Sequence, residues 1–316
     1  MRPLRFIPDN TTIDFAGRRF YAFAFTLALF VITIGALGVR GLNLGIDFTG
    51  GYLMEVAGPQ AFNVGDVRTK MNGLNFGEVE VQEFGGPNAL LIRIQPPEQQ
   101  VDQEVIVNAV KDTLGPGMDY RRVEFVGPRV GQEFFRDGMI ASALAVLMIG
   151  LYVAFRFEWQ FGVSALVATF HDVFVTLGLF SVLQLDFNLT AIACLLTLAG
   201  YSINDTVVVF DRIRENLRRY KRADFRTIIN MSVNQTLSRT IMTSATTALS
   251  ITPLLFFGGS VLENFTVGML FGIVIGTFSS IYVAASLLLY MRPLAPAASD
   301  DGETEAKGAK SGGVRA

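Results

Sequence analysis

Six long apolar stretches divide the chain, and more polar sequence separates the first from the second. They span residues 20–39, 138–155, 161–185, 187–210, 240–262 and 265–291. Crossing a hydrocarbon core of roughly 30 Å takes about 20 apolar residues in a helix. The first stretch is followed by Arg40 rather than by a small-residue cleavage site, so we expect it to stay as an anchor. The pattern predicts a polytopic α-helical membrane protein with six transmembrane helices.

Residues 40–137 contain short apolar segments with strand and helix patterns, and they predict a folded domain outside the membrane. Alternating or continuous apolar positions indicate strands at 52–56, 78–84, 89–94 and 120–126, and helical spacing indicates helices at 64–74 and 101–114. The order βαββαβ is typical of a ferredoxin-like α+β domain. The segment contains no His and no Cys, so we expect it to act through contact, or only as a stability module.

The composition is typical of a membrane protein and excludes several kinds of binding site. The 316 residues are 51% hydrophobic and 17% charged, well below the charged share of about a quarter in soluble proteins. The net charge of -2 argues against nucleic-acid binding. Cys194 is the single cysteine, which excludes an intrachain disulfide and a zinc site built from thiolates. We expect no cofactor and no metal.

The distribution of Lys and Arg predicts the orientation, because these residues resist translocation in short loops. The N-terminal tail 1–19 and the segment 211–236 are both rich in arginine, and we place them in the cytoplasm. The turns near Asp186 and Glu263 contain no Lys or Arg, and we place them on the periplasmic side with the 40–137 domain. Both termini are then cytoplasmic, and the polar tail 292–316 is expected to be disordered.

Ionisable residues inside the spans are the candidates for function, because charges in a bilayer are costly. They are His171, Asp172, Asp205 and Arg239. Asp205 lies roughly 10 Å from the cytoplasmic end of its span, and Arg239 enters the next span from that side, so the two could form an ion pair that protonation breaks. Alternatively, these groups only bond helices together, and His171 with Asp172 could be satisfied locally.

Polar side chains near these groups follow helical faces. One face could carry Thr197, Tyr201, Asn204 and Asp205, and another Thr236, Arg239, Thr243, Thr246 and Ser250. In the last span, small residues recur every four positions at Gly268, Gly272, Gly276, Ser280 and Ala284. Small residues at this spacing let helix backbones approach closely, so they predict a tight helix interface that could slide.

Three motifs resemble the SecF family of the SecD/SecF group, subunits of the bacterial SecDF protein-export complex within the RND superfamily. They are GIDFTGG at 45–51, LAGYSINDTVVVFDRIREN at 198–216 and LSRTIMTSATT at 237–247. The resemblance implies pairing with SecD, association with SecYEG, YajC and functionally SecA, and an unfolded preprotein substrate. It also implies that Asp205 and Arg239 serve proton-driven movement, with a less defined role for residues 171–173.

The predicted function is therefore an auxiliary subunit of the Sec translocase in the inner membrane, which with SecD couples the proton motive force to preprotein export. A small-molecule RND exporter is an alternative that the chain length disfavours, and a passive scaffold for SecD stays open. An intramembrane enzyme would need an HExxH zinc helix or a paired Ser and His. With His171 as the single histidine, we expect a transport subunit without catalytic activity.

Overall fold

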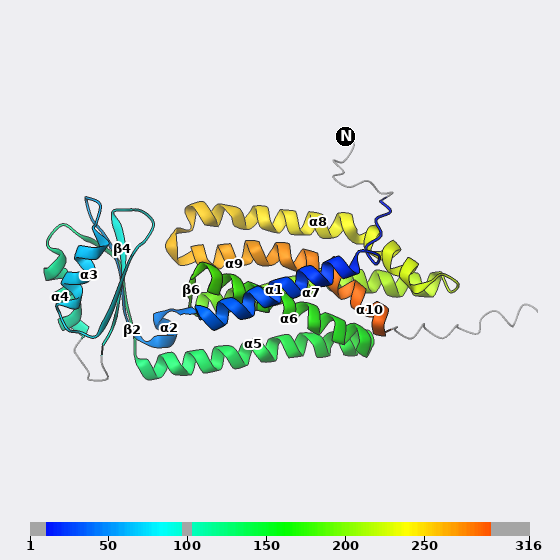
Figure 1. The fold of residues 1–316 in the computed structure, drawn as a ribbon, viewed down its shortest axis with the longest axis horizontal. Helices are drawn as coiled ribbons and strands as arrows, with labels where there is room; N and C mark the ends of the chain where they lie inside the picture. Colours follow the sequence, from blue (N-terminus) through cyan, green and yellow to red (C-terminus); the bar gives the residue numbers. More distant parts are fainter. Residues whose placement is uncertain (1–10, 97–102, 292–316) are drawn as a thin grey trace, which may run out of the picture.

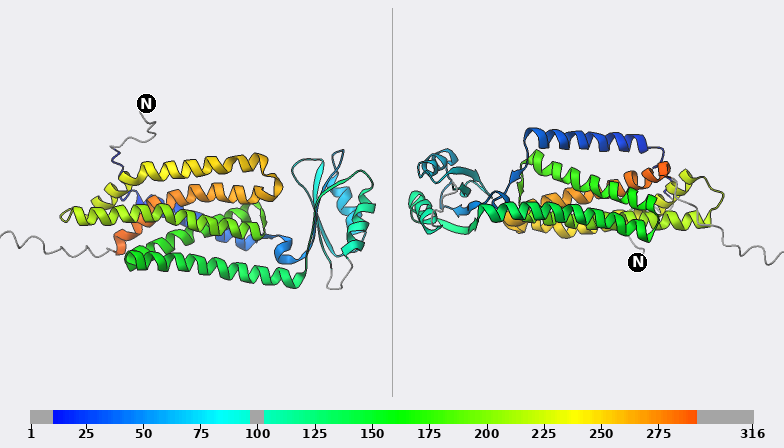
Figure 2. Two further views of the ribbon diagram at one scale, coloured as in Figure 1. Left: turned by 180° about the vertical axis from the view of Figure 1, so that it is seen from behind. Right: turned by 90° about the horizontal axis from the view of Figure 1, so that it is seen from below.

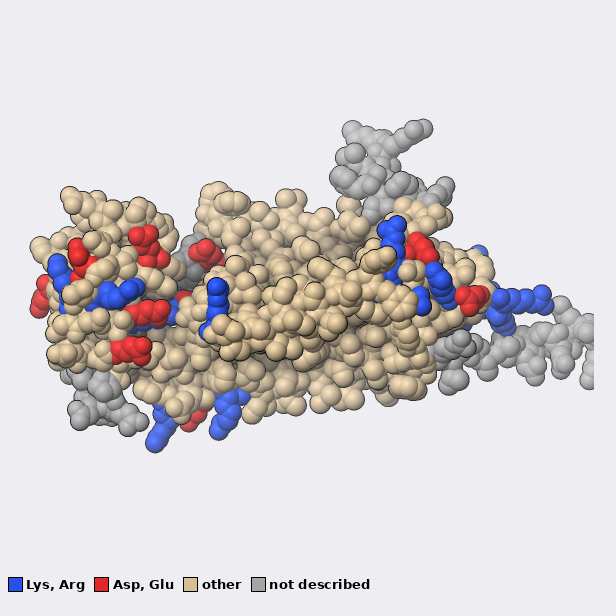
Figure 3. Space-filling model, viewed as in Figure 1, with Lys and Arg blue, Asp and Glu red and all other residues tan. Residues whose placement is uncertain are grey.

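The computed structural model describes residues 11–96 and 103–291, so the predicted tail 292–316 lies outside the described residues. An α/β domain sits at one end of a long helical bundle, and the first described helix starts at the other end (Figure 1). Charged side chains gather toward the two ends of the molecule, and the face shown in Figure 3 has a broad middle region with few of them. This is the surface that a chain spanning a bilayer needs.

The bundle contains helices long and apolar enough for six membrane spans within the described residues. They are α1 Arg19–Val39, α5 Pro128–Arg156, α6 Trp159–Leu183, α7 Leu189–Arg219, α8 Phe225–Phe257, and a last span formed by α9 Gly259–Phe278, the π-helix η1 Ser279–Ala284 and α10 Ala285–Met291. The predicted six-helix architecture is confirmed. From below, α1 lies along one side of the other helices (Figure 2).

Several helices extend beyond the apolar stretches that predicted them. The α5 helix already begins at Pro128, inside the predicted 40–137 domain. The α7 helix continues to Arg219 and α8 begins at Phe225, so most of the predicted basic segment 211–236 is helical. Hydropathy reports only the part of a helix that lies in lipid, whereas backbone hydrogen bonding continues into water wherever residues favour it.

The α/β domain has the predicted βαββαβ order. Its elements are β2 Gly51–Ala57, α3 Val64–Asn72, β3 Glu78–Glu83, β4 Ala89–Gln95, α4 Gln103–Leu114 and β5 Asp119–Val126. The antiparallel sheet has the order β3-β4-β2-β5, so the two central strands are β4 and β2. Side chains such as Met54, Ile92 and Ile106 form a core between the sheet and the two helices.

Two short elements join the α/β domain to the bundle. Strand β1 Asn43–Leu44 pairs in parallel with β6 Asp186–Phe187, which lies in the turn between α6 and α7. The single turn α2 Ile46–Thr49 then leads to Gly50 and Gly51, whose φ angles are 74° and 113°. A Cβ on Gly50 would lie 2.7 Å from the Pro128 Cα atom. Glycine is required here by both backbone conformation and space.

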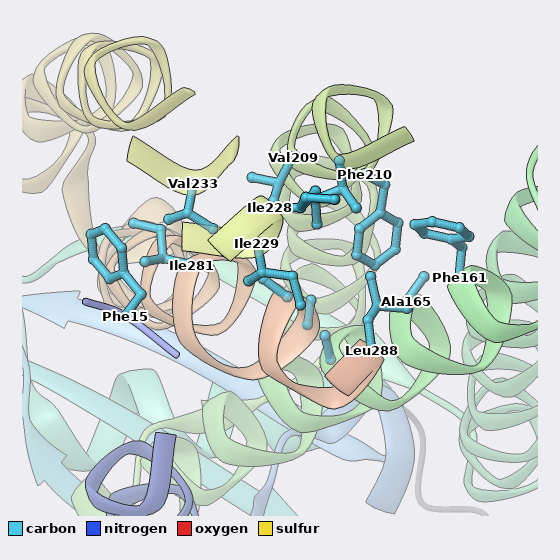
Figure 4. Close-up of a cluster of buried hydrophobic side chains, with 14 of the residues drawn as sticks. Phe15, Phe161, Ala165, Val209, Phe210, Ile228, Ile229, Val233, Ile281 and Leu288 are labelled. Atoms are coloured by element: carbon cyan, nitrogen blue, oxygen red, sulfur yellow. The ribbon is translucent and has the colours of Figure 1, made fainter. Parts of the chain in front are cut away.

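The segment 11–18 is fastened to the end of the bundle remote from the α/β domain. Asn234 donates to the Ile13 carbonyl (2.8 Å) and accepts from the Ile13 amide (3.0 Å), and Asn230 accepts from the Ala16 amide (2.8 Å). Phe15 is buried in an apolar cluster with residues of α8 and η1, including Val233 and Ile281 (Figure 4). We call this segment the N-terminal clip.

Candidate functional site

Asp172, on α6, is the most connected buried acid in the bundle. Its side chain is fully buried, and its Oδ1 atom lies 2.8 Å from His171 Nδ1. Its Oδ2 atom accepts hydrogen bonds from Ser202 of α7 (2.5 Å) and from Ser279 at the start of η1 (2.7 Å). One carboxyl group thus joins three spans. We call these four residues the Asp172 cluster.

His171 has one ring nitrogen in this cluster and one outside it. Nε2 is buried and has no hydrogen-bond partner among the described residues. The ring stacks on Phe30 of α1, with 5.7 Å between ring centroids. The Nδ1 contact holds the ring beside Asp172, and the stacking on Phe30 packs α6 against α1 at this position.

Asp205 lies on α7, one helical turn beyond Ser202, and its carboxylate contacts α8. Its carboxylate accepts from Thr243 Oγ1 at 3.2 Å and from Ser244 Oγ at 3.5 Å, and its side chain is 3% exposed. Ser244 in turn bonds Thr277 of α9 at 2.6 Å. Hydroxyl groups are thus the direct partners of this acid in the part of the chain that the structure describes.

The expected ion pair between Asp205 and Arg239 is not formed. Arg239 is exposed at the surface of α8, and no ion pair to it is found within residues 11–96 and 103–291. Asp205 sits opposite Thr243, about one helical turn beyond Arg239, so nearby hydroxyls occupy the carboxylate instead.

The polar faces predicted on α7 and α8 are only partly shared between helices. Tyr201 donates to Ser244 (3.4 Å) and Thr243 donates to Asp205, so these two residues do line a common seam. Other members bond the carbonyls of their own helix, namely Thr197, Thr236, Thr246 and Ser250. Asn204 is exposed. Threonine and serine satisfied within their own helix do not need a partner span.

The small residues of the last span face α7 in register. An added Cβ would meet Cys194 Sγ at 2.9 Å from Gly268, Leu198 Cδ2 at 2.5 Å from Gly272, and Ser202 Cβ at 3.2 Å from Gly276. The next position, Ser280, is 2.9 Å from Thr206 Oγ1. The glycines therefore bring α9 against α7 within this chain, and the π-helix begins where that contact reaches the Asp172 cluster.

Helix α7 connects the two buried acids. Three of its residues lie at helical spacing and reach different neighbours. Ser202 contacts Asp172, Asp205 contacts α8, and Thr206 contacts η1. Ser202 and Ser279 were not predicted as site residues, because serine is common in membrane helices and no periodic pattern distinguishes these two. A π-helix often marks a functional position in a helix.

Comparison with known proteins agrees with this architecture. Residues 106–293 match the family described as "Protein export membrane protein SecD/SecF, C-terminal", and residues 35–57 match the "SecD/SecF GG Motif". The second match includes Gly50 and Gly51 at the domain junction.

Relatives match over almost the whole chain. The protein translocase subunit SecF of Rickettsia prowazekii is 40% identical over 90% of this chain and 93% of its own length. That of Vibrio alginolyticus is 42% identical over 88% of this chain and 89% of its own.

Two solved SecDF structures have the same fold. The crystal structure of SecDF, a translocon-associated membrane protein from Thermus thermophilus, has a TM-score of 0.83 and 37% identity over 92% of this chain. A SecDF structure in a super-membrane-facing form has a TM-score of 0.67 and 36% identity. This chain spans 40% of the length of each. The predicted resemblance is confirmed: the chain belongs to the SecD/SecF family of protein export membrane proteins and has a role in protein export.

Proposed function

We propose that this chain pairs with SecD in the inner membrane and couples the proton motive force to preprotein export. The observation that carries the proposal is the buried acid Asp205, which touches hydroxyl groups but no counter-ion among the described residues. A carboxylate in such a place is costly when ionised and is a natural site for a proton. The Asp172 cluster contains a second buried acid, which is bonded to α7 through Ser202, three residues before Asp205.

Protonation can be converted into movement because each acid bonds groups on other helices. When Asp205 is ionised it accepts from Thr243 and Ser244, and when it is protonated one oxygen becomes a donor and this bonding must rearrange. Moving one charge through the membrane potential is worth about 2.3 kcal/mol per 100 mV, which can shift a two-state helix arrangement severalfold or more.

The two SecDF structures support a change of shape. Identity and coverage are nearly the same for both, whereas the TM-scores are 0.83 and 0.67. We take this difference to mean that the shared elements can be arranged in more than one way. A bistable arrangement is what a proton-driven device requires.

The surface of α8 supports pairing with SecD. Arg239, Thr246 and Ser250 are all exposed on this helix in the isolated chain. An arginine facing lipid is costly, so a partner helix with acceptors would cover this face. SecD is the partner that the SecDF relatives suggest. SecYEG, YajC and SecA would be further associates, both termini would be cytoplasmic, and the subunit would have no catalytic activity of its own.

The test is preprotein translocation into inside-out vesicles with and without a proton gradient, in the presence of SecD. Asp205→Asn keeps the size and hydrogen-bonding capacity of the side chain but cannot titrate. We expect normal abundance and loss of gradient-dependent stimulation. Asp211→Asn, an exposed acid further along the same helix, is the matched control and should behave as wild type. Full stimulation in Asp205→Asn would instead make this chain a passive scaffold for SecD.

A further inference from the structure

Arg93 is a buried charge on the face of the sheet that points away from the domain core. Along β4, Leu90, Ile92 and Ile94 pack into that core. Side chains alternate along a strand, so Leu91 and Arg93 point to the opposite face, where Leu91 packs against Ile46 of the junction. The Arg93 side chain is only 5% exposed.

The guanidinium of Arg93 connects the sheet to the turn between α6 and α7. It forms an ion pair with Asp186 of β6 and donates to Asn43 Oδ1 of β1 at 3.0 Å. Asn43 also donates to Asp186 Oδ1 at 2.9 Å, which closes a triangle of three side chains. Glu80 of β3 is a second acidic partner of Arg93, at 3.3 Å, but it is half exposed.

Asp186 lies where the two helices of the candidate site meet. The α6 helix, with Asp172, ends just before it, and α7, with Asp205, begins just after it. Asn264 near the start of the last span also donates to the Asp186 carbonyl, at 3.4 Å. Helices are stiff, so a shift of α6 against α7 reaches this turn, and the turn holds the sheet through Arg93.

We propose that Arg93 and Asp186 are positioning residues that fix the orientation of the α/β domain on the bundle and transmit movement of the α6–α7 pair to it. Loss of the Asp186 contact would leave this buried arginine with only the half-exposed Glu80 as its acid, so loosening the contact is unfavourable and the connection is stiff. The orientation part stands on these contacts alone, and the transmission part rests on the proposed function.

The test measures orientation separately from export. In the full chain with SecD, spin labels at Val105 of the domain and Leu144 of α5, both exposed, would report the distance between domain and bundle. Cys194 is first replaced by serine. Measured without a gradient, this distance does not depend on proton coupling at Asp205, so failure of the two proposals can be told apart.

Arg93→Met keeps much of the side-chain length and removes the charge. We expect it to broaden the distance distribution and to lower gradient-dependent export severalfold, at normal abundance. Arg93→Lys keeps the charge, so it should broaden the distribution less and retain part of the export. Arg121→Met is the control, because that arginine is exposed on the same sheet and pairs with Asp119 and Glu55 inside the domain.

If Arg93→Met unfolds the domain, Asp186→Asn tests the proposed orientation instead, because this substitution lies outside the domain and keeps a polar group. A wild-type distance distribution in Asp186→Asn would overturn the proposed orientation. A broadened distribution with undiminished export would overturn the proposed transmission.

Discussion

Replacing Gly272 with leucine tests whether α9 must lie against α7 for the bundle to be stable. Even the first added carbon would lie 2.5 Å from Leu198 Cδ2 and 2.6 Å from Leu198 Cδ1. Carbon atoms in contact are normally about 3.5–4.0 Å apart, so the groups must separate by about 1 Å. Leu198 is completely buried and has little room to move.

Overpacking of this kind costs about 1–3 kcal/mol. For a chain of this size that corresponds to a fall in Tm of about 2–6 °C, measured by thermal unfolding of the purified complex in detergent. The control is Gly200→Leu on α7, where an added Cβ has no neighbour within 4 Å. Leucine favours helix over glycine by roughly 1 kcal/mol, so this variant should be as stable as wild type or slightly more so.

The larger effect is expected on the Asp172 cluster, since a wider gap at Gly272 also separates Gly276 from Ser202, one turn further on. Gly272→Leu should therefore reduce co-purification with SecD or export as well as Tm. Wild-type melting together with full export in this variant would refute the view that the stripe is a tight interface.

Two further predictions concern orientation and the N-terminal clip. Cysteines at Asn88 and Glu263 should react with an impermeant thiol reagent outside spheroplasts, while one at Arg219 should not; labelling of position 219 would reverse the proposed topology. Asp14 in the clip has a pKa below the usual 3.8, chiefly because Asn230 donates to it and also because of the Gly17 amide and Arg226. A lowered folded-state pKa means that this contribution is present above pH about 4 and is lost as pH falls through the lowered pKa. The protection of the clip amides, measured as the exchange rate relative to the intrinsic rate at the same pH, should thus fall only in strong acid, and Asp14→Asn should remove that dependence; a loss of protection between pH 5 and 7 that Asp14→Asn abolishes would contradict it.

Much of the architecture could be predicted because it depends on periodicity. Apolar runs long enough for a bilayer and the two-residue alternation of Val79 and Val81 are properties of the local sequence. The candidate acids could also be predicted, because an ionisable group in an apolar run is conspicuous whatever it contacts. The ends of the helices could be predicted less well, because α5 and α8 continue past the apolar residues that predicted them.

Partners of the buried groups could not be predicted in the same way. The axial offset between α7 and α8 places Thr243, not Arg239, opposite Asp205, and a shift of one helical turn would exchange them. Ser202 and Ser279 gain their importance only because three spans converge on Asp172. In the sequence Arg93 is a single charge in an apolar strand, and its partner Asp186 becomes evident only in the folded structure.

The sequence by itself determined which segments enter the membrane, the order of elements in the α/β domain and which residues are charged inside the bundle, because these follow from local transfer free energies and backbone periodicity. Tertiary structure alone decided that the glycines of α9 face Cys194, Leu198 and Ser202, that Asp205 is held by hydroxyls, and that the domain is fastened through Arg93. These contacts join residues that lie 38 to 93 positions apart in the sequence. They depend on the relative rotation and height of rigid helices, which packing of the whole bundle sets and no local pattern records.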